Sequence, residues 1–136
     1  MSTLKPPTNP ESDPRVKAVF DDIRATRNSD FVGNVWKYLA FDPALLENTW
    51  QGIKQTMGTE SIIPKKYKEM IYAAVSIANS CEYCIHSHTM QAKQAGMTDP
   101  EYAEFLEIVS LAAKTNHLLT AMQVPLDPVM DLSTEA

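Results

Sequence analysis

The segment SCEYCIHSH, from Ser80 to His88, gathers most of the residues in this chain that could do chemistry. It holds both cysteines and two of the three histidines of the 136-residue sequence. A cysteine thiolate is a nucleophile and a metal ligand, and an imidazole exchanges protons near neutral pH. The segment could therefore form a redox pair, a metal site, a haem anchor or part of a helix core, and its spacing helps to choose among them.

The spacing places Cys81, Cys84 and His88 at positions i, i+3 and i+7. Residues three and four apart are neighbours on a helix surface, so these three side chains would lie on nearly one face. On that face two thiols could join, and an imidazole would lie close enough to act as their base. The geometry thus favours a redox pair with a nearby base.

A cap residue just before the cysteines would place them at a helix start. Asn79 and Ser80 are both good N-cap residues, so we expect a helix that begins near Cys81 and runs to Gly96. The unpaired N–H groups and the positive end of the helix dipole favour an anion there, and a thiolate is such an anion.

A carboxylate is expected to join the histidine by simple counting along the chain. Glu69 lies ten residues before Asn79, and His88 lies nine residues after it. If two helices fold back antiparallel at this point, Glu69 and His88 come to the same level. A carboxylate that orients an imidazole or accepts its proton completes an arrangement of nucleophile, base and orienting group.

The elements that would position these residues are all helical. Start signals, apolar residues at helical spacing and the lack of period-two alternation predict an all-α, single-domain bundle of about six helices. One of these helices pairs with the cysteine-bearing helix as a hairpin. We expect a flexible arm over residues 1–13, a helical domain over 14–125 and a tail over 126–136. The start signals are Asp13-Pro14, Asp42-Pro43, Pro64 and the capping box of Thr98 with Glu101.

Composition excludes several classes of function. The formal net charge of −5 and the scattered basic residues argue against a nucleic-acid binder. No apolar run reaches the roughly 18 residues of a membrane span, and the first residues lack a stretch of signal-peptide length. We therefore expect a cytosolic protein, a setting in which two cysteines are rarely a structural staple.

The chain combines Glu69, eleven intervening residues, a CxxC pair from Cys81 to Cys84, and then His88. This pattern resembles that of a known family. It is similar to the alkylhydroperoxidase D-like branch of the carboxymuconolactone decarboxylase family. The segment KEMIYAAVSIANSCEYCIHSHTMQAKQAGM is close to the core helical hairpin of that family, and TNHLLTAMQVPLD resembles the segment that follows it. The resemblance covers about residues 60–127.

This resemblance implies an all-α fold that assembles as a trimer or hexamer, with a thiol-dependent peroxidase or disulfide-reductase activity and no cofactor. Cys84 would attack a small hydroperoxide, Cys81 would resolve the product as a disulfide, and His88 with Glu69 would relay protons. An external dithiol or disulfide reductase would then restore the thiols.

Three further residues have less definite expected roles. His86 occupies a position that the family often fills with other residues, so we expect it beside the site rather than in the reaction. Tyr72 is one residue off the apolar stripe of its helix and could line the site. His117 stands where the family commonly has Arg after Asn, which is a departure from the pattern.

Other uses of the cysteines remain open from the residues alone. Zinc could take two cysteines with His86 and His88, but His86 would point about 160° away from the shared face on a helix of ~100° per residue. A c-type haem needs His directly after the second Cys, where this chain has Ile85. The cysteines could also be inert, buried core residues.

Two other functions also remain as alternatives. The first is a non-catalytic helical oligomer whose thiols sense redox state or simply pack. The second is the lactone decarboxylase reaction that names the wider family, although decarboxylase members generally lack the paired CxxC.

Overall fold

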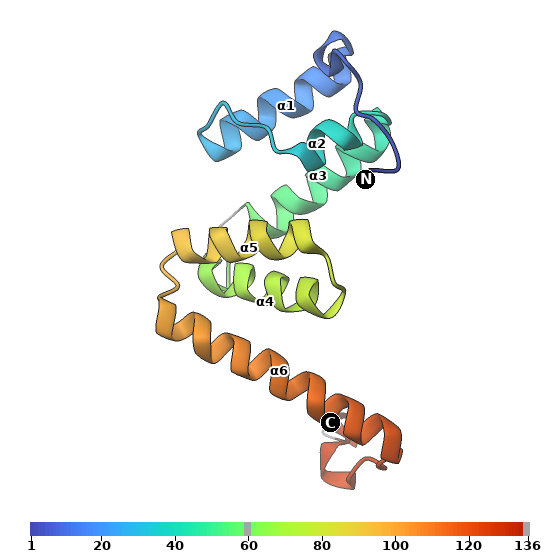
Figure 1. The fold of residues 1–136 in the computed structure, drawn as a ribbon, viewed down its shortest axis with the longest axis vertical. Helices are drawn as coiled ribbons and strands as arrows, with labels where there is room; N and C mark the ends of the chain where they lie inside the picture. The colour runs from blue at the N-terminus through green and yellow to red at the C-terminus, as the bar shows by residue number, and fades with distance from the viewer. Residues whose placement is uncertain (59–60, 135–136) are drawn as a thin grey trace. The chain divides into compact units, whose positions relative to one another are not determined.

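A computed structural model describes residues 1–58 and 61–134 of the chain. Within them the regular elements are all helical, and the prediction of an all-α fold with about six helices is confirmed. The chain divides into two compact units, Met1–Ile62 and Ile63–Ala136 (Figure 1). The α-helices are α1 (Pro14–Arg27), α2 (Asn34–Leu39), α3 (Pro43–Met57), α4 (Lys65–Ala78), α5 (Glu82–Gln94) and α6 (Asp99–Met122), and the short 3₁₀ helices are η1 (Pro10–Ser12), η2 (Pro128–Met130) and η3 (Leu132–Thr134).

Four helices begin where the sequence predicts. Pro64 is the N-cap residue of α4, and side chains cap the other three helices. The Asp13 side chain accepts a hydrogen bond from the backbone N–H of Arg15, and Asp42 caps α3 in the same way. Thr98 and Glu101 form the predicted capping box at the start of α6. These side chains satisfy N–H groups that the first turn of a helix leaves unpaired.

The first unit packs α1, α2 and α3 around a core that contains two tryptophans. Trp36 and Trp50 meet edge to face, with ring centroids 5.3 Å apart. The Trp50 indole N–H donates to Asp22 at 2.6 Å, and Lys54 pairs with the same carboxylate at 2.9 Å. The remaining buried members of this core are Val16, Val19, Phe20, Ile23, Val32, Ala40 and Leu46.

The second unit contains the hairpin of α4 and α5, which lie side by side (Figure 1). Its turn is a Schellman motif in which Ser80 adopts the left-handed conformation, with φ of 56°. Ser80 N–H donates to the carbonyl of Ile77, and Cys81 N–H donates to the carbonyl of Ser76. This turn ends α4 and starts α5 within two residues. α6 follows, and Lys66 on α4 pairs with Glu101 on α6 at 2.8 Å.

The two helices of the hairpin meet through a face of α4 that carries small and polar residues. The buried residues of α4 are Glu69, Ala73 and Ser76, at positions i, i+4 and i+7 of one face. Its apolar stripe points elsewhere, and Ile71 and Val75 are each about half exposed. An apolar stripe identifies a surface that needs cover, but it does not say which partner covers it.

The two ends of the chain carry short helical turns. In the first unit, Glu11 of η1 pairs with Arg24 of α1 at 2.8 Å. After α6 the chain continues into η2 and η3, and the last two residues of the expected tail lie outside the described residues. The division into an arm, a domain and a tail stays a prediction. No helix in the described part of the chain is long and apolar enough to cross a membrane.

Candidate active site

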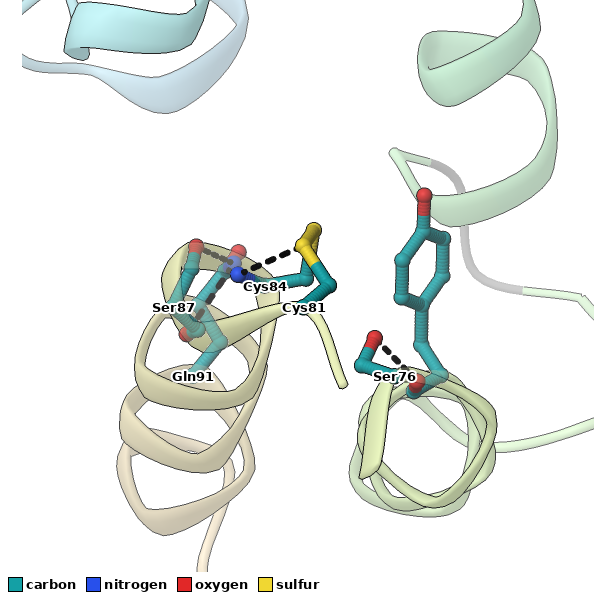
Figure 2. The surroundings of a disulfide bond; sticks show 6 residues. Ser76, Cys81, Cys84, Ser87 and Gln91 are labelled. Carbon is teal, nitrogen blue, oxygen red and sulfur yellow. Dashed lines mark hydrogen bonds between the residues drawn. A yellow bond between two sulfur atoms is a disulfide. The ribbon is translucent and has the colours of Figure 1, made fainter. Parts of the chain in front are cut away.

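A disulfide between Cys81 and Cys84 stands at the start of α5, with Cα atoms 5.3 Å apart (Figure 2). Cys81 is itself the N-cap of this helix, and its Sγ accepts a hydrogen bond from the backbone N–H of Cys84 at 3.3 Å. The expectation that Asn79 or Ser80 caps the helix is therefore wrong. Asn79 ends α4 and Ser80 occupies the left-handed position of the turn, so the capping position falls to Cys81.

This position determines how the first sulfur would behave once the disulfide is reduced. An N-cap side chain accepts hydrogen bonds from N–H groups that have no helical partner, and the positive end of the helix dipole favours a negative charge there. A Cys81 thiolate would keep the hydrogen bond from Cys84 N–H. The first turn of α5 is therefore suited to holding an ionised sulfur.

A buried carboxylate and an imidazole meet between the two helices. Glu69 on α4 is only 1% exposed, and its Oε2 lies 2.6 Å from Nδ1 of His88 on α5. The His88 side chain is 13% exposed. Because a carboxylate can only accept, Nδ1 carries the hydrogen and donates it, which leaves Nε2 as the ring nitrogen that can exchange a proton. The expectation that Glu69 faces His88 across the hairpin is confirmed.

An aromatic ring completes the surroundings of this histidine. The ring of Tyr72 stacks on that of His88, with centroids 3.7 Å apart and planes 26° apart. Tyr72 lies one turn after Glu69 on α4, so both residues reach His88 from the same helix. The backbone there carries an extra hydrogen bond, because the Ser76 hydroxyl donates to the Tyr72 carbonyl at 2.7 Å.

The other two histidines lie elsewhere. His86 is exposed and lines an open groove between α5 and the start of α6, together with Thr89, Lys93 and Tyr102. This agrees with the expectation that His86 points away from the face of Cys81, Cys84 and His88. His117 is exposed on the second half of α6.

Two residues of the site escaped the sequence reasoning. Ala73 and Ser76 share the buried face of α4 with Glu69, and Ser76 lies near the disulfide (Figure 2). Their spacing was the available signal, because small residues at i+4 and i+7 from a buried acid mark a face where another helix can approach closely. On α5, Gln91 donates to the Ser87 hydroxyl at 3.2 Å one to two turns beyond the disulfide (Figure 2).

The zinc alternative would need Cys81, Cys84, His86 and His88 to converge on one point. Over residues 1–58 and 61–134, no three His, Cys, Asp or Glu side chains converge in an arrangement that could hold a metal ion. Cys81 and Cys84 are bonded to each other, and His86 lies in the groove between α5 and the start of α6.

Comparison with known proteins places this helical fold and its cysteine pair in a family. Residues 43–127 match the carboxymuconolactone decarboxylase family, so the chain belongs to that family. Within the family, its fold is like that of a solved structure, the alkylhydroperoxidase AhpD core from Rhodospirillum rubrum. Their sequences are 54% identical, and the match covers 95% of this chain and 96% of the other. The two structures superpose with a TM-score of 0.90. No curated protein matches the chain.

Proposed function

We propose that this protein is a thiol-dependent peroxidase that reduces small organic hydroperoxides, with Cys84, Cys81, His88 and Glu69 as its catalytic residues. The observation that carries the proposal is the hairpin itself. A tight turn joins α4, which carries the buried Glu69 carboxylate, to α5, which carries the CxxC pair. His88, whose imidazole is hydrogen-bonded to Glu69, lies one helical turn beyond the second cysteine. The similarity to an alkylhydroperoxidase core supports the same class of reaction.

The reaction begins with the reduced pair. The Cys84 thiolate attacks the terminal oxygen of the hydroperoxide, the O–O bond breaks, and Cys84 becomes a sulfenic acid while an alkoxide leaves. His88 takes the thiol proton and returns it to the alkoxide, which leaves as an alcohol. Cys81 then condenses with the sulfenic acid, so that the disulfide forms and one water is released.

A second substrate must restore the thiols. An external dithiol, or a disulfide reductase that presents one, attacks the Cys81–Cys84 disulfide, leaves as its own disulfide and returns both thiols to the protein. The cytosol keeps such reductants available, so we propose that the protein works there. The capping position of Cys81 supports this half of the cycle, because a sulfur that is stable as a thiolate is a good leaving group.

A thiol count after a stoichiometric oxidant tests the proposal. The protein is reduced, freed of reductant and mixed with one equivalent of tert-butyl hydroperoxide, and its free thiols are then titrated. We expect both thiols of each chain to be lost, with one equivalent of alcohol formed. In Cys81→Ser we expect a sulfenic acid on Cys84 that dimedone traps, because the resolving thiol is missing.

The matched variant Cys84→Ser separates this proposal from the alternatives. It retains one thiol at the helix cap, and we expect that thiol to survive the oxidant. If the two wild-type thiols survive the peroxide as well, the peroxidase proposal is wrong, and the pair packs or senses other oxidants. Loss of the thiols without formation of alcohol would contradict the proposed chemistry in the same way.

We also propose that the protein forms a homo-oligomer, a trimer or a hexamer. Phe105 is the only buried residue of α6, and every residue of this helix from Ser110 onward is exposed. Leu111, Leu118 and Met122 stand at i, i+7 and i+11 of one face and are 61%, 49% and 62% exposed. An apolar stripe of this length left to water would be a liability, and a second copy of the chain is a partner that could cover it.

Light scattering on a sizing column tests the assembly. We expect a mass of three or six times the 15.2 kDa chain for the wild type, and a smaller species for Leu111→Glu. A wild-type mass equal to one chain would contradict the proposal.

A further inference from the structure

We propose that Tyr72 is a positioning residue for the reaction, which holds the His88 ring in the orientation that keeps Nδ1 on Glu69 and Nε2 available for proton exchange. The inference deepens the proposed peroxidase function and rests on it. It assigns a role to a side chain that is neither a thiol nor part of the proton path.

A histidine ring can turn about the bond that joins it to Cβ, and a half turn exchanges the ring nitrogen beside Glu69 for a carbon. The Tyr72 ring covers one face of the imidazole at 3.7 Å, nearly parallel to it. Turning the imidazole about that bond would drive the edge of the imidazole into the Tyr72 ring. The stack therefore opposes the turn that would break the hydrogen bond between Glu69 and Nδ1.

The face of an aromatic ring carries the negative part of its quadrupole, and it attracts a cation placed above it. When His88 accepts the proton of a thiol it becomes an imidazolium, which lies between the Tyr72 face and the Glu69 carboxylate. Both neighbours stabilise that charge, and a hydrocarbon side chain in place of Tyr72 would leave only the carboxylate.

Tyr72 is itself held in place. It lies on the side of α4 next to the buried face of Glu69, Ala73 and Ser76, and it is partly buried. Its carbonyl accepts from the Ser76 hydroxyl in addition to its place in the helix. A ring on a turn of helix positions its neighbour more precisely than a ring on a loop.

Rates measured on three variants test the role. Tyr72→Phe keeps the aromatic face, and we expect its rate of thiol oxidation by tert-butyl hydroperoxide to stay within about twofold of the wild type. Tyr72→Leu and Tyr72→Met remove the face while keeping bulk, and we expect a fall of about 3- to 10-fold. Tyr67→Leu, at an exposed ring on the same helix, is the matched control and should leave the rate unchanged.

Nuclear magnetic resonance of the His88 ring provides a readout that does not depend on activity. In the wild type we expect the ring-carbon protons to be shifted strongly upfield by the Tyr72 ring current, and the ring nitrogens to report a single Nδ1–H tautomer. In Tyr72→Leu we expect that tautomer to mix with the Nε2–H form, and in Tyr72→Phe to persist. A purely structural role for Tyr72 would leave the tautomer unchanged.

The outcomes separate the two proposals. Equal rates and an unchanged tautomer in Tyr72→Leu and Tyr72→Met would overturn the positioning role, whether or not the protein is a peroxidase. Should both variants fail to fold, the wild-type spectrum still decides, since the absence of an upfield shift would mean that the stack is absent. If the thiols are inert to the hydroperoxide but the tautomer of His88 changes in Tyr72→Leu, the peroxidase function is overturned. The positioning of His88 by Tyr72 then still holds.

Discussion

Removal of the His88 imidazole should destabilise the protein chiefly because it leaves the buried Glu69 carboxylate without its partner. In His88→Ala the Glu69 carboxylate, only 1% exposed, loses the partner that donates to it at 2.6 Å. Leaving a buried carboxylate without its partner typically costs about 3–5 kcal/mol of the free energy of unfolding. Loss of the stack with Tyr72 adds about 0.5–1.5 kcal/mol.

The companion substitution Glu69→Gln should cost much less. The amide has the shape of the carboxylate, and its oxygen can still accept from Nδ1 of His88. The change replaces a charge-assisted hydrogen bond with a neutral one, a difference of about 1–1.5 kcal/mol.

The double variant gives the sharpest result. A neutral amide left without a partner costs about 1–3 kcal/mol, less than a bare carboxylate in the same place. We therefore expect His88→Ala with Glu69→Gln to be more stable than His88→Ala alone, by about 1–2 kcal/mol. The second substitution, destabilising in the wild type, becomes stabilising once the imidazole is gone.

Urea unfolding followed by circular dichroism measures these free energies. All four proteins are compared at one chain concentration with the disulfide intact, because assembly makes stability depend on concentration. If the cost of Glu69→Gln simply adds to that of His88→Ala, the two side chains are not coupled, and the reasoning about a buried pair is refuted.

Three further predictions concern elements away from this pair. The hydrogen bond from Lys66 lowers the pKa of Glu101 from 4.5 to about 2, so the stability it contributes is present above pH 4.5 and is lost as the pH falls through about 2. Thermal melting of Glu101→Gln should thus fall below the wild type at neutral pH and converge with it near pH 2, whereas a constant gap would contradict the linkage. Thr98→Ala removes the cap of α6 and should cost about 1 kcal/mol in urea unfolding, and no change would mean that the capping box contributes nothing. Trp50→Phe removes the hydrogen bond to Asp22 and leaves a smaller ring in the core, so it should cost about 1–3 kcal/mol by the same measurement, and an unchanged stability would contradict this.

Much of the fold could be predicted because its signals are local. Asp13 and Asp42, each followed by proline, and the pair of Thr98 and Glu101 satisfy their own helix starts with side chains close in sequence. The meeting of Glu69 and His88 is almost as local, since a tight turn fixes which residues of a helical hairpin lie opposite each other.

The features that sequence reasoning missed depend on choices between similar local options. Asn79, Ser80 and Cys81 could each cap a helix, and the hydrogen bonds of the turn decide in favour of Cys81. The hairpin closes on the small residues of α4 and not on its apolar stripe, because close approach of two helices depends on size as well as on hydrophobicity. The spacing of Ile71 and Val75 predicts an apolar face, but spacing within one helix does not identify the partner that covers this face.

The rate at which the reduced protein consumes a hydroperoxide tests most directly whether the carboxylate and the imidazole serve the thiols. Stopped-flow measurement of the second-order rate constant with tert-butyl hydroperoxide at neutral pH compares the wild type with Glu69→Gln, both reduced and both folded. Positioned acid–base groups are worth about 10²–10⁴-fold in rate, so we predict that Glu69→Gln is slower by about 100-fold while still losing two thiols per chain. Equal rate constants for the two proteins would contradict the account.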